Sequence, residues 1–460
     1  MEGIKVKLAS LKVSKLYDCY DYDIKFNPDV TFIYGQNGCG KTTILNITEA
    51  IITGKLFKLF YYGFCQIKLE YFYKDEPDKM KSIIIKKKED KLLVTFNNGE
   101  YEIERKNNQR EFRRARITDY DCYFNDYDFL EKIKNTFNYV YLPLNRQSNW
   151  YDNKDERNYI MRKMRTRFME LNDIYEEDSV NKDVTMRRIE CLIYDSYSKI
   201  NSEISKISDD FRDEILKSSL TFSDSEYSIK SVAEELSSQN VDELNSVKDT
   251  YIKMLKELAK ITRDEEEKFN DFFDDFIKLF SNYKKKKHNI EKFNLIELIM
   301  KFQQILRIKD LVGIAEKTER RKDDKRKPIR IFIDIMNEFV RNGEEEKKIE
   351  IDSFGKVYFT TKYSGERCID IQSLSSGEKQ LITFFAHLIF NVKNTTSGIF
   401  VVDEPELSLH LSWQQKFVEK ILEINSNIQL IFATHSPEII GKNRNKVFKL
   451  EKKYVGKAGE

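Results

Sequence analysis

The stretch GQNGCGKTT at residues 35–43 combines three glycines with one lysine and two threonines. Its spacing fits the phosphate-loop pattern G-x-x-x-x-G-K-S/T. Glycines allow backbone N–H groups to curl around phosphates, and a helix that begins at Lys41 adds the positive end of its dipole. We expect Lys41 to reach the β- and γ-phosphates of ATP and Thr42 to bind Mg²⁺. The predicted nucleotide-binding residues of this loop are Gly35, Asn37, Gly38, Gly40, Lys41, Thr42 and Thr43.

The neighbours of the loop separate this interpretation from a structural glycine turn. The apolar run VTFIYG (30–35) predicts a buried strand that ends at the first glycine. The run KTTILNITEAII (41–52) has apolar residues at helical spacing. A strand before the loop and a helix after it are the context that a phosphate loop requires, so the context favours nucleotide binding.

Two carboxylates and one histidine supply the remaining chemistry. In GIFVVDEPE, four apolar residues end at Asp403 and Glu404, which places both acids at the carboxyl end of a predicted strand. We expect Asp403 to hold Mg²⁺ through water and Glu404 to orient the water that attacks the nucleotide. His435 ends the next apolar run, IFATHSPE, and is the predicted γ-phosphate contact. A lone histidine is more often a core residue, but this one follows a predicted strand.

Composition limits the possible partners and the compartment. The 460 residues include 79 Lys and Arg against 77 Asp and Glu, so the net charge of +2 excludes a bulk polycation. Six cysteines form no C-x-x-C pair, which favours reduced thiols, a cytoplasmic protein and no structural zinc. No apolar run has the length of a signal peptide or of a membrane span, so we expect no membrane partner.

The chain divides into three predicted segments. Residues 1–149 are strand-rich with one clear helix, residues 150–328 are charged and predicted to be helical, and residues 329–460 alternate strands and helices. We interpret the outer two segments as one α/β lobe split in sequence. Its first half also carries a predicted antiparallel sheet, built from the alternating runs CQIKLEYFY, SIIIKKK, KLLVTF and EYEIERK.

The middle segment has two apolar stripes at helical spacing, which indicate packing in a hydrophobic core rather than a ligand-binding site. We expect the first stripe to share one buried face: Phe269, Phe272, Phe273, Phe276 and Phe280. The second predicted stripe consists of Phe293, Ile296, Ile299, Met300 and Phe302. Polar clusters such as SDSEYS and SSQNVDE interrupt the pattern, so we expect a compact helical insertion rather than a long antiparallel coiled coil.

Together, GQNGCGKTT, LSSGEKQ, DEPELSLH and ATHSP resemble the motifs of ABC-type ATPases of the SMC, RecF and OLD branch. The resemblance covers residues 1–145 and 328–450. It implies an α/β P-loop lobe with an antiparallel β subdomain and an inserted α-helical domain. It also implies ATP and Mg²⁺ as cofactors and hydrolysis of ATP to ADP and phosphate.

The stretch SLSSGEKQ (373–380) contains the signature sequence of this family. In the family, the signature caps a nucleotide held by a different ATPase lobe. The resemblance therefore implies a head-to-tail dimer or higher homo-oligomer, in which Ser375, Ser376 and Gly377 contact the partner's nucleotide. It implies further that Ser408 faces the partner. Gln147 is a candidate for the glutamine that senses Mg²⁺ and water. Arg146 is an equally good candidate for a phosphate contact.

The chain resembles most closely the stand-alone ATPase subunits of antiphage defence systems, PARIS first and Septu second. Such subunits control a separate effector, so we expect a Toprim-type or HNH nuclease partner. The alternative is a RecF- or SMC-like repair ATPase that acts on DNA directly. The basic segment ERKNNQREFRRAR (104–116) is a candidate surface for nucleic acid or for an acidic protein that mimics DNA. A solvated charged loop explains it equally well.

Overall fold

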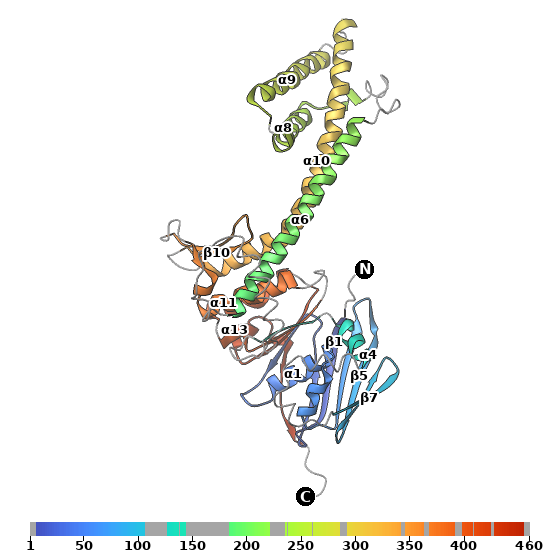
Figure 1. Ribbon diagram of the computed structural model, residues 1–460, viewed down its shortest axis with the longest axis vertical. Coiled ribbons are helices and arrows are strands. Elements are labelled where there is room, and N and C mark those ends of the chain that lie inside the picture. Colours follow the sequence, from blue (N-terminus) through green and yellow to red (C-terminus); the bar gives the residue numbers. More distant parts are fainter. Residues whose placement is uncertain are drawn as a thin grey trace, which may run out of the picture. The chain divides into compact units, whose positions relative to one another are not determined.

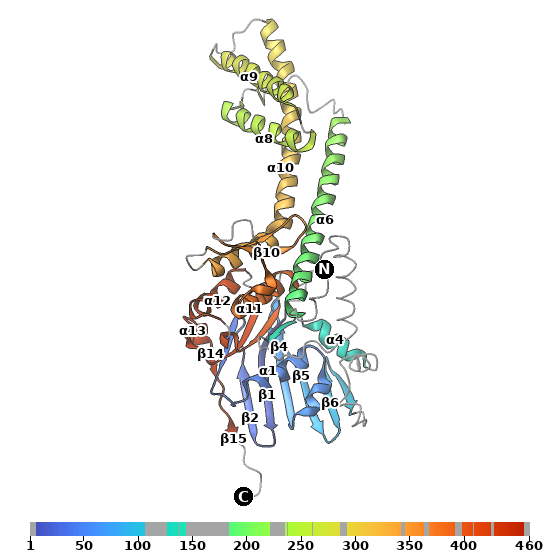
Figure 2. The same cartoon turned by 60° about the vertical axis from the view of Figure 1, so that its left-hand side comes forward.

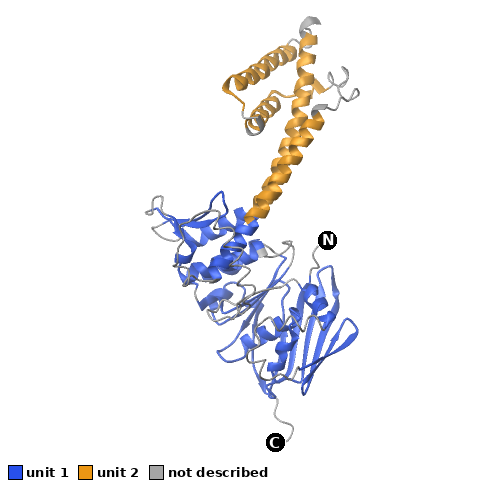
Figure 3. Cartoon of the chain, in the orientation of Figure 1, with its two compact units in different colours: residues 1–196, 328–460 blue, residues 197–327 orange. Residues whose placement is uncertain are grey.

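A computed structural model describes residues 6–105, 127–137, 139–143, 184–220, 235–236, 238–259, 261–285, 292–341, 346–362, 368–391, 398–407, 409–424 and 427–454. The chain forms two compact units, Met1–Ser196 with Pro328–Glu460, and Tyr197–Lys327 (Figure 3). We call the first unit the lobe and the second the helical unit. Within the described part of the chain, no helix is both long enough and apolar enough to cross a membrane.

The centre of the lobe is a parallel sheet of five strands (Figure 1). In spatial order these are β14 (Val447–Lys449), β3 (Val30–Tyr34), β13 (Gln429–Thr434), β12 (Ile399–Asp403) and β8 (Tyr139–Pro143). The register pairs Asp403 with Ala433 and Thr434 with Tyr34. Because the strands are parallel and end together, the residues that follow them collect at one edge of the sheet.

The second sheet is antiparallel and has seven strands, of which β1, β2, β4, β5, β6 and β15 are labelled in Figure 2. In spatial order they are β15 (Lys453–Tyr454), β2 (Tyr20–Lys25), β1 (Val6–Leu16), β4 (Gln66–Tyr73), β5 (Glu76–Lys88), β6 (Lys91–Phe96) and β7 (Gly99–Glu104). A third sheet contains β11 (Ile369–Asp370), β10 (Val357–Thr360) and β9 (Lys348–Ile351). The predicted antiparallel subdomain is therefore present and includes strands from both ends of the chain.

Helices cover both faces of the parallel sheet. They are α1 (Lys41–Ile52), α4 (Asp128–Thr136), α11 (Ser376–Ala386), α12 (Leu411–Ile424) and α13 (Pro437–Ile440), with short helical turns η1 (Leu56–Tyr61), η4 (Ile371–Ser373), η5 (His387–Asn391), η6 (Pro405–Leu407) and η7 (Arg444–Lys446). Alternate residues of β12 enter different cores because side chains alternate along a strand. Val401 packs with α1 and the antiparallel sheet, whereas Phe400 and Val402 pack with α11 and α12. The predicted α/β fold class is confirmed.

The helical unit contains α8 (Val241–Ala259), α9 (Arg263–Lys285) and most of two long helices, α6 (Val184–Leu220) and α10 (Lys292–Val340). Two ion pairs join the long helices within this unit, Lys325–Glu203 at 2.7 Å and Arg321–Asp210 at 3.7 Å. The partners advance in opposite directions along the chain, so the two helices run antiparallel.

This helix pair corrects the expectation that the insertion contains no long antiparallel pair of helices, although the unit itself is compact. The polar clusters do not interrupt the long helices: SSQNVDE falls at the start of α8, after α6 has ended. SDSEYS lies outside the described residues. The expectation failed because SSQNVDE marks a boundary between two helices, α6 and α8, and not an interruption within one helix.

The two apolar stripes of this unit have different outcomes. Phe273, Phe276 and Phe280 of α9 are fully buried, and Phe276 stacks on Phe302 of α10 with 5.8 Å between ring centroids. The second predicted stripe is wrong in part, because Ile296 and Met300 are 58% and 62% exposed. The buried face of α10 is instead marked by Leu298, Phe302, Ile305 and Leu306.

Candidate functional site

The phosphate loop joins β3 to α1, as the sequence predicts. Gly40 is the N-cap of α1 and has φ +103°, and Gly38 has φ +78°, a region that side chains rarely adopt. A Cβ at Gly40 would also meet the Tyr22 hydroxyl at 2.9 Å. The same hydroxyl donates to the Cys39 carbonyl at 3.0 Å, so β2 supports the loop from outside the motif. No sequence motif indicates this role of Tyr22.

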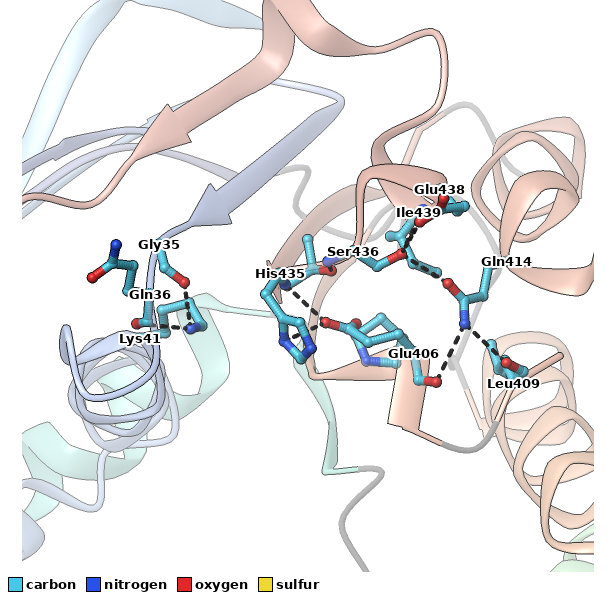
Figure 4. A network of polar contacts seen from close by, with 12 residues as sticks. Gly35, Gln36, Lys41, Glu406, Leu409, Gln414, His435, Ser436, Glu438 and Ile439 are labelled. Carbon is cyan, nitrogen blue, oxygen red and sulfur yellow. Dashed lines mark hydrogen bonds and ion pairs between the residues drawn. The ribbon is translucent and has the colours of Figure 1, made fainter. Parts of the chain in front are cut away.

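Lys41 is only 5% exposed and points back into the loop. Its Nζ donates to the carbonyls of Gly35 at 2.8 Å and Gln36 at 3.3 Å (Figure 4). A buried ammonium next to backbone N–H groups at a helix N-terminus is an environment that attracts an anion.

Asp403 lies at the end of β12, close enough to the Thr42 hydroxyl for this group to lower its pKa. Burial raises the pKa of Asp403 to about 6; Thr42 and Lys41 oppose this, and Glu404 and Glu406 add to it. Its Oδ1 atom is buried without a hydrogen-bond partner. A divalent cation would satisfy this oxygen and offset the clustered negative charge, so the donor set fits Mg²⁺.

Glu404 has φ +48°, in the left-handed region that is uncommon for a residue other than glycine. Its backbone N–H donates to the Ala433 carbonyl at 2.8 Å, which holds this conformation against the neighbouring strand. A non-glycine residue in this region costs about 1–3 kcal/mol and is typical of functional sites.

His435 follows β13, the strand that lies between the phosphate-loop strand and the carboxylate strand. Its Nδ1 is 3.0 Å from Glu406 Oε1, and its backbone N–H donates to the same oxygen at 2.8 Å. Glu406 was not among the predicted site residues. The one available signal was its place as the second glutamate of DEPE, two residues after Glu404.

The signature residues lie elsewhere in the lobe. Ser375 caps α11 and forms a capping box with Glu378, while Ser375 and Ser376 are exposed and Gly377 is buried. Glu378 also pairs with Lys347 at 2.8 Å. Burial would raise the pKa of Glu378, but its bonds to Lys347 and Ser375 hold the pKa below the usual value. Figure 1 shows α11 apart from α1, at whose N-terminus the phosphate loop lies.

Several predicted residues lie outside the described part of the chain. These are Arg146, Gln147, Ser408 and residues 106–116 of the basic segment. Of that segment, Arg105 is described, and it lies 3.6 Å from Asp90 in an exposed ion pair. Among the described residues, no cluster of three or more His, Cys, Asp or Glu residues could hold a metal ion by itself.

The fold and these motifs define a P-loop protein of the ABC type. A family model described as "AAA domain, putative AbiEii toxin, Type IV TA system" matches residues 189–441, more than half of the chain. The chain belongs to this family. The phosphate loop itself lies before the matched region.

Two curated relatives share part of the sequence. The "Retron Vc95 probable ATPase" of Vibrio cholerae serotype O1 biovar El Tor is 29% identical over 37% of this chain and 36% of its own length. The "Septu protein PtuA" of Bacillus thuringiensis is 28% identical over 24% of this chain and 34% of its own length. The matches thus span about a third of each relative. They confirm the resemblance to the ATPases of defence systems such as Septu, whereas the resemblance to PARIS stays a prediction.

A solved structure of the Smc head domain with an extended coiled coil, bound to the C-terminal domain of ScpA and derived from Pyrococcus furiosus, aligns over 98% of this chain and 96% of its own. The identity is 14% and the TM-score is 0.39.

Proposed function

We propose that the protein binds ATP with Mg²⁺ and hydrolyses it slowly, as a switch. One observation carries the proposal: the Asp403 carboxyl, whose pKa Thr42 and Lys41 both lower, has a buried Oδ1 atom without a hydrogen-bond partner. A phosphate loop and an acidic strand end, distant in sequence, thus meet at one edge of a parallel sheet. This is the arrangement that phosphoryl transfer requires.

The roles of the residues follow from their chemistry. Lys41 and the loop N–H groups bind the β- and γ-phosphates, and Thr42 with Asp403 would hold Mg²⁺, which neutralises charge on the phosphates when bound. Glu404 orients the attacking water. His435 contacts the γ-phosphate from the adjacent strand.

Exposure of Ser375 and Ser376 at the start of α11 supports the second part of the proposal, a nucleotide-sandwich dimer. In such a dimer each site combines Lys41, Asp403 and Glu404 of one chain with Ser376 and Gly377 of the other. The pair is isologous and closed by a two-fold axis, so two sites form together.

The relatives support a role in antiphage defence, in which this chain senses or scaffolds and a separate nuclease of the Toprim or HNH type acts. One relative is named as a retron ATPase and another as a Septu protein.

Glu404→Gln tests the enzymatic core. The substitution removes the water-orienting carboxylate and leaves Lys41 and Thr42 intact, so ATP binding should persist while turnover falls by about 10²–10³-fold. The measurements are phosphate release and binding of a fluorescent ATP analogue. Lys41→Ala should abolish binding itself, and Glu423→Gln on the exposed side of α12 is the matched control. Wild-type turnover in Glu404→Gln would refute the role of Glu404.

A further inference from the structure

Glu406 is a buried carboxylate that the proposed chemistry does not use. It lies in η6, directly after Glu404 and Pro405, and its side chain is 6% exposed. Its Oε1 accepts the backbone N–H of His435 at 2.8 Å and lies 3.0 Å from Nδ1 of the same residue. One oxygen therefore holds both the backbone and the ring of a single histidine (Figure 4).

We propose that Glu406 is a positioning residue that fixes the tautomer and direction of the His435 ring. A carboxylate can only accept hydrogen bonds, so an Nδ1 atom at 3.0 Å must carry the proton. The neutral ring then has its lone pair on Nε2, the atom left to meet the nucleotide. This inference rests on the proposed function, because it assigns a position within that site.

A second contact between the same two segments keeps Glu406 in place. Gln414 donates through Nε2 to the Glu406 carbonyl at 3.3 Å and to the Leu409 carbonyl at 2.9 Å. Its Oε1 accepts from the Ser436 hydroxyl at 2.8 Å. Gln414 and Ser436 are 8% and 7% exposed. The segment after β12 and the segment after β13 are thus joined by a buried polar network, so the ring and its acceptor move together.

Stability alone does not explain a charge at this position. Glu406 Oε2 is buried without a hydrogen-bond partner, and the Glu406 charge contributes to the raised pKa of Asp403. A buried unpartnered oxygen and repulsion between carboxylates both oppose folding. A carboxylate that is present despite these two unfavourable effects is consistent with a functional role. A neutral side chain would hold the His435 ring less firmly.

The direct test observes the ring nitrogens of His435 without nucleotide. The sequence has four histidines, so ¹⁵N-histidine labelling of the full chain gives few resonances, and His435→Ala identifies the relevant ones. At about pH 8, where a free imidazole is neutral, we expect the Nδ1–H tautomer in the wild type. Glu406→Met, which has no carboxylate acceptor, should give a mixture of tautomers. Glu406→Gln should keep the bias because its amide oxygen can still accept.

Activity gives the second readout. Glu406→Met should lower kcat by about 10–100-fold, the effect typical when a metal-bound histidine loses the group that orients it, with KM for ATP within about threefold. Glu406→Gln should recover part of that loss. Glu423→Gln is the control: it removes an exposed carboxylate of α12 that pairs with Lys420 at 2.8 Å.

Two outcomes overturn the proposal. The first is a wild-type His435 that carries its proton on Nε2, and the second is an unchanged tautomer in Glu406→Met. If Glu406→Met does not fold, the wild-type tautomer and the Glu406→Gln kinetics still decide. If the wild type shows no ATP hydrolysis, the proposed function fails, while the tautomer measurement continues to test the positioning role.

Discussion

Two acidic groups of the lobe, Asp403 and Glu378, are both substantially buried, yet their pKa values move in opposite directions. Burial raises that of Asp403 to about 6, because Thr42 and Lys41 compensate only in part. For Glu378, burial acts in the same direction, but Lys347 and Ser375 outweigh it. The strand-end site has an unsatisfied charge, which a bound cation would offset. The signature segment satisfies the charge of Glu378 within the chain itself.

The two regions are also in contact. Gln380, one turn into α11, donates to the Pro405 carbonyl at 3.3 Å, next to both Glu404 and Glu406. The signature helix α11 is therefore hydrogen-bonded to the segment that follows the strand end with the unsatisfied charge.

A substitution in either region should abolish ATP turnover. Two such substitutions that lie in different chains of one dimer should complement each other. Lys41→Ala removes a phosphate contact, and Gly377→Asp puts a carboxylate where the partner's nucleotide is expected. Each pure variant should lose on the order of 10³-fold in ATPase activity. A mixed dimer has one doubly damaged site and one intact site, so mixing should restore part of the activity, measured as phosphate release.

The control for this experiment is the mass of the mixed species with ATP, which shows that mixed dimers form. Full activity in a protein that remains monomeric with ATP would contradict the sandwich. An absence of recovery in verified mixed dimers would show instead that the two sites depend strictly on each other.

Asp403→Asn should stabilise the nucleotide-free lobe at neutral pH. The folded-state pKa of about 6 lies above the ordinary 3.8, so the carboxyl favours folding when protonated and this contribution disappears as pH rises through about 4–6. At ~1.36 kcal/mol per pH unit, the ionised group costs roughly 3 kcal/mol above pH 6. Urea unfolding followed by fluorescence of Trp413, which packs in the lobe core, measures the difference.

The increase in the free energy of unfolding that Asp403→Asn produces should shrink toward zero near pH 4, where the wild-type carboxyl is protonated. Asp78→Asn, at an exposed position of β5, should change the free energy of unfolding little at any pH. An Asp403→Asn variant less stable than the wild type at pH 7.5 would show that the charge is already compensated within the protein.

Glu378→Gln should have the opposite sign and a smaller size. It weakens the capping box with Ser375 and the pair with Lys347, which should cost about 1–2 kcal/mol at pH 7. The lowered pKa of Glu378 means that its contribution is present above the ordinary carboxyl pKa and is lost as pH falls through the folded-state value. The same urea titration at several pH values measures it, and a variant equally stable at pH 7 would contradict this account.

The local features of this protein follow from its sequence alone. The phosphate loop, its flanking strand and helix, and the capping box of Ser375 and Glu378 each depend on residues a few positions apart. The two carboxylates of DEP were predicted at a strand end because an apolar run stops there. Such features form from short-range interactions, and the motifs that carried the family resemblance are of this kind.

Contacts between distant segments were decided only by tertiary structure. Glu406 and His435 are 29 residues apart and meet because β12 and β13 are neighbours in the sheet. The pairing of α6 with α10 joins Glu203 to Lys325, so no local pattern could establish it. The raised pKa of Asp403 depends on which segments exclude water from it, and that is fixed only once the strands and helices have packed together.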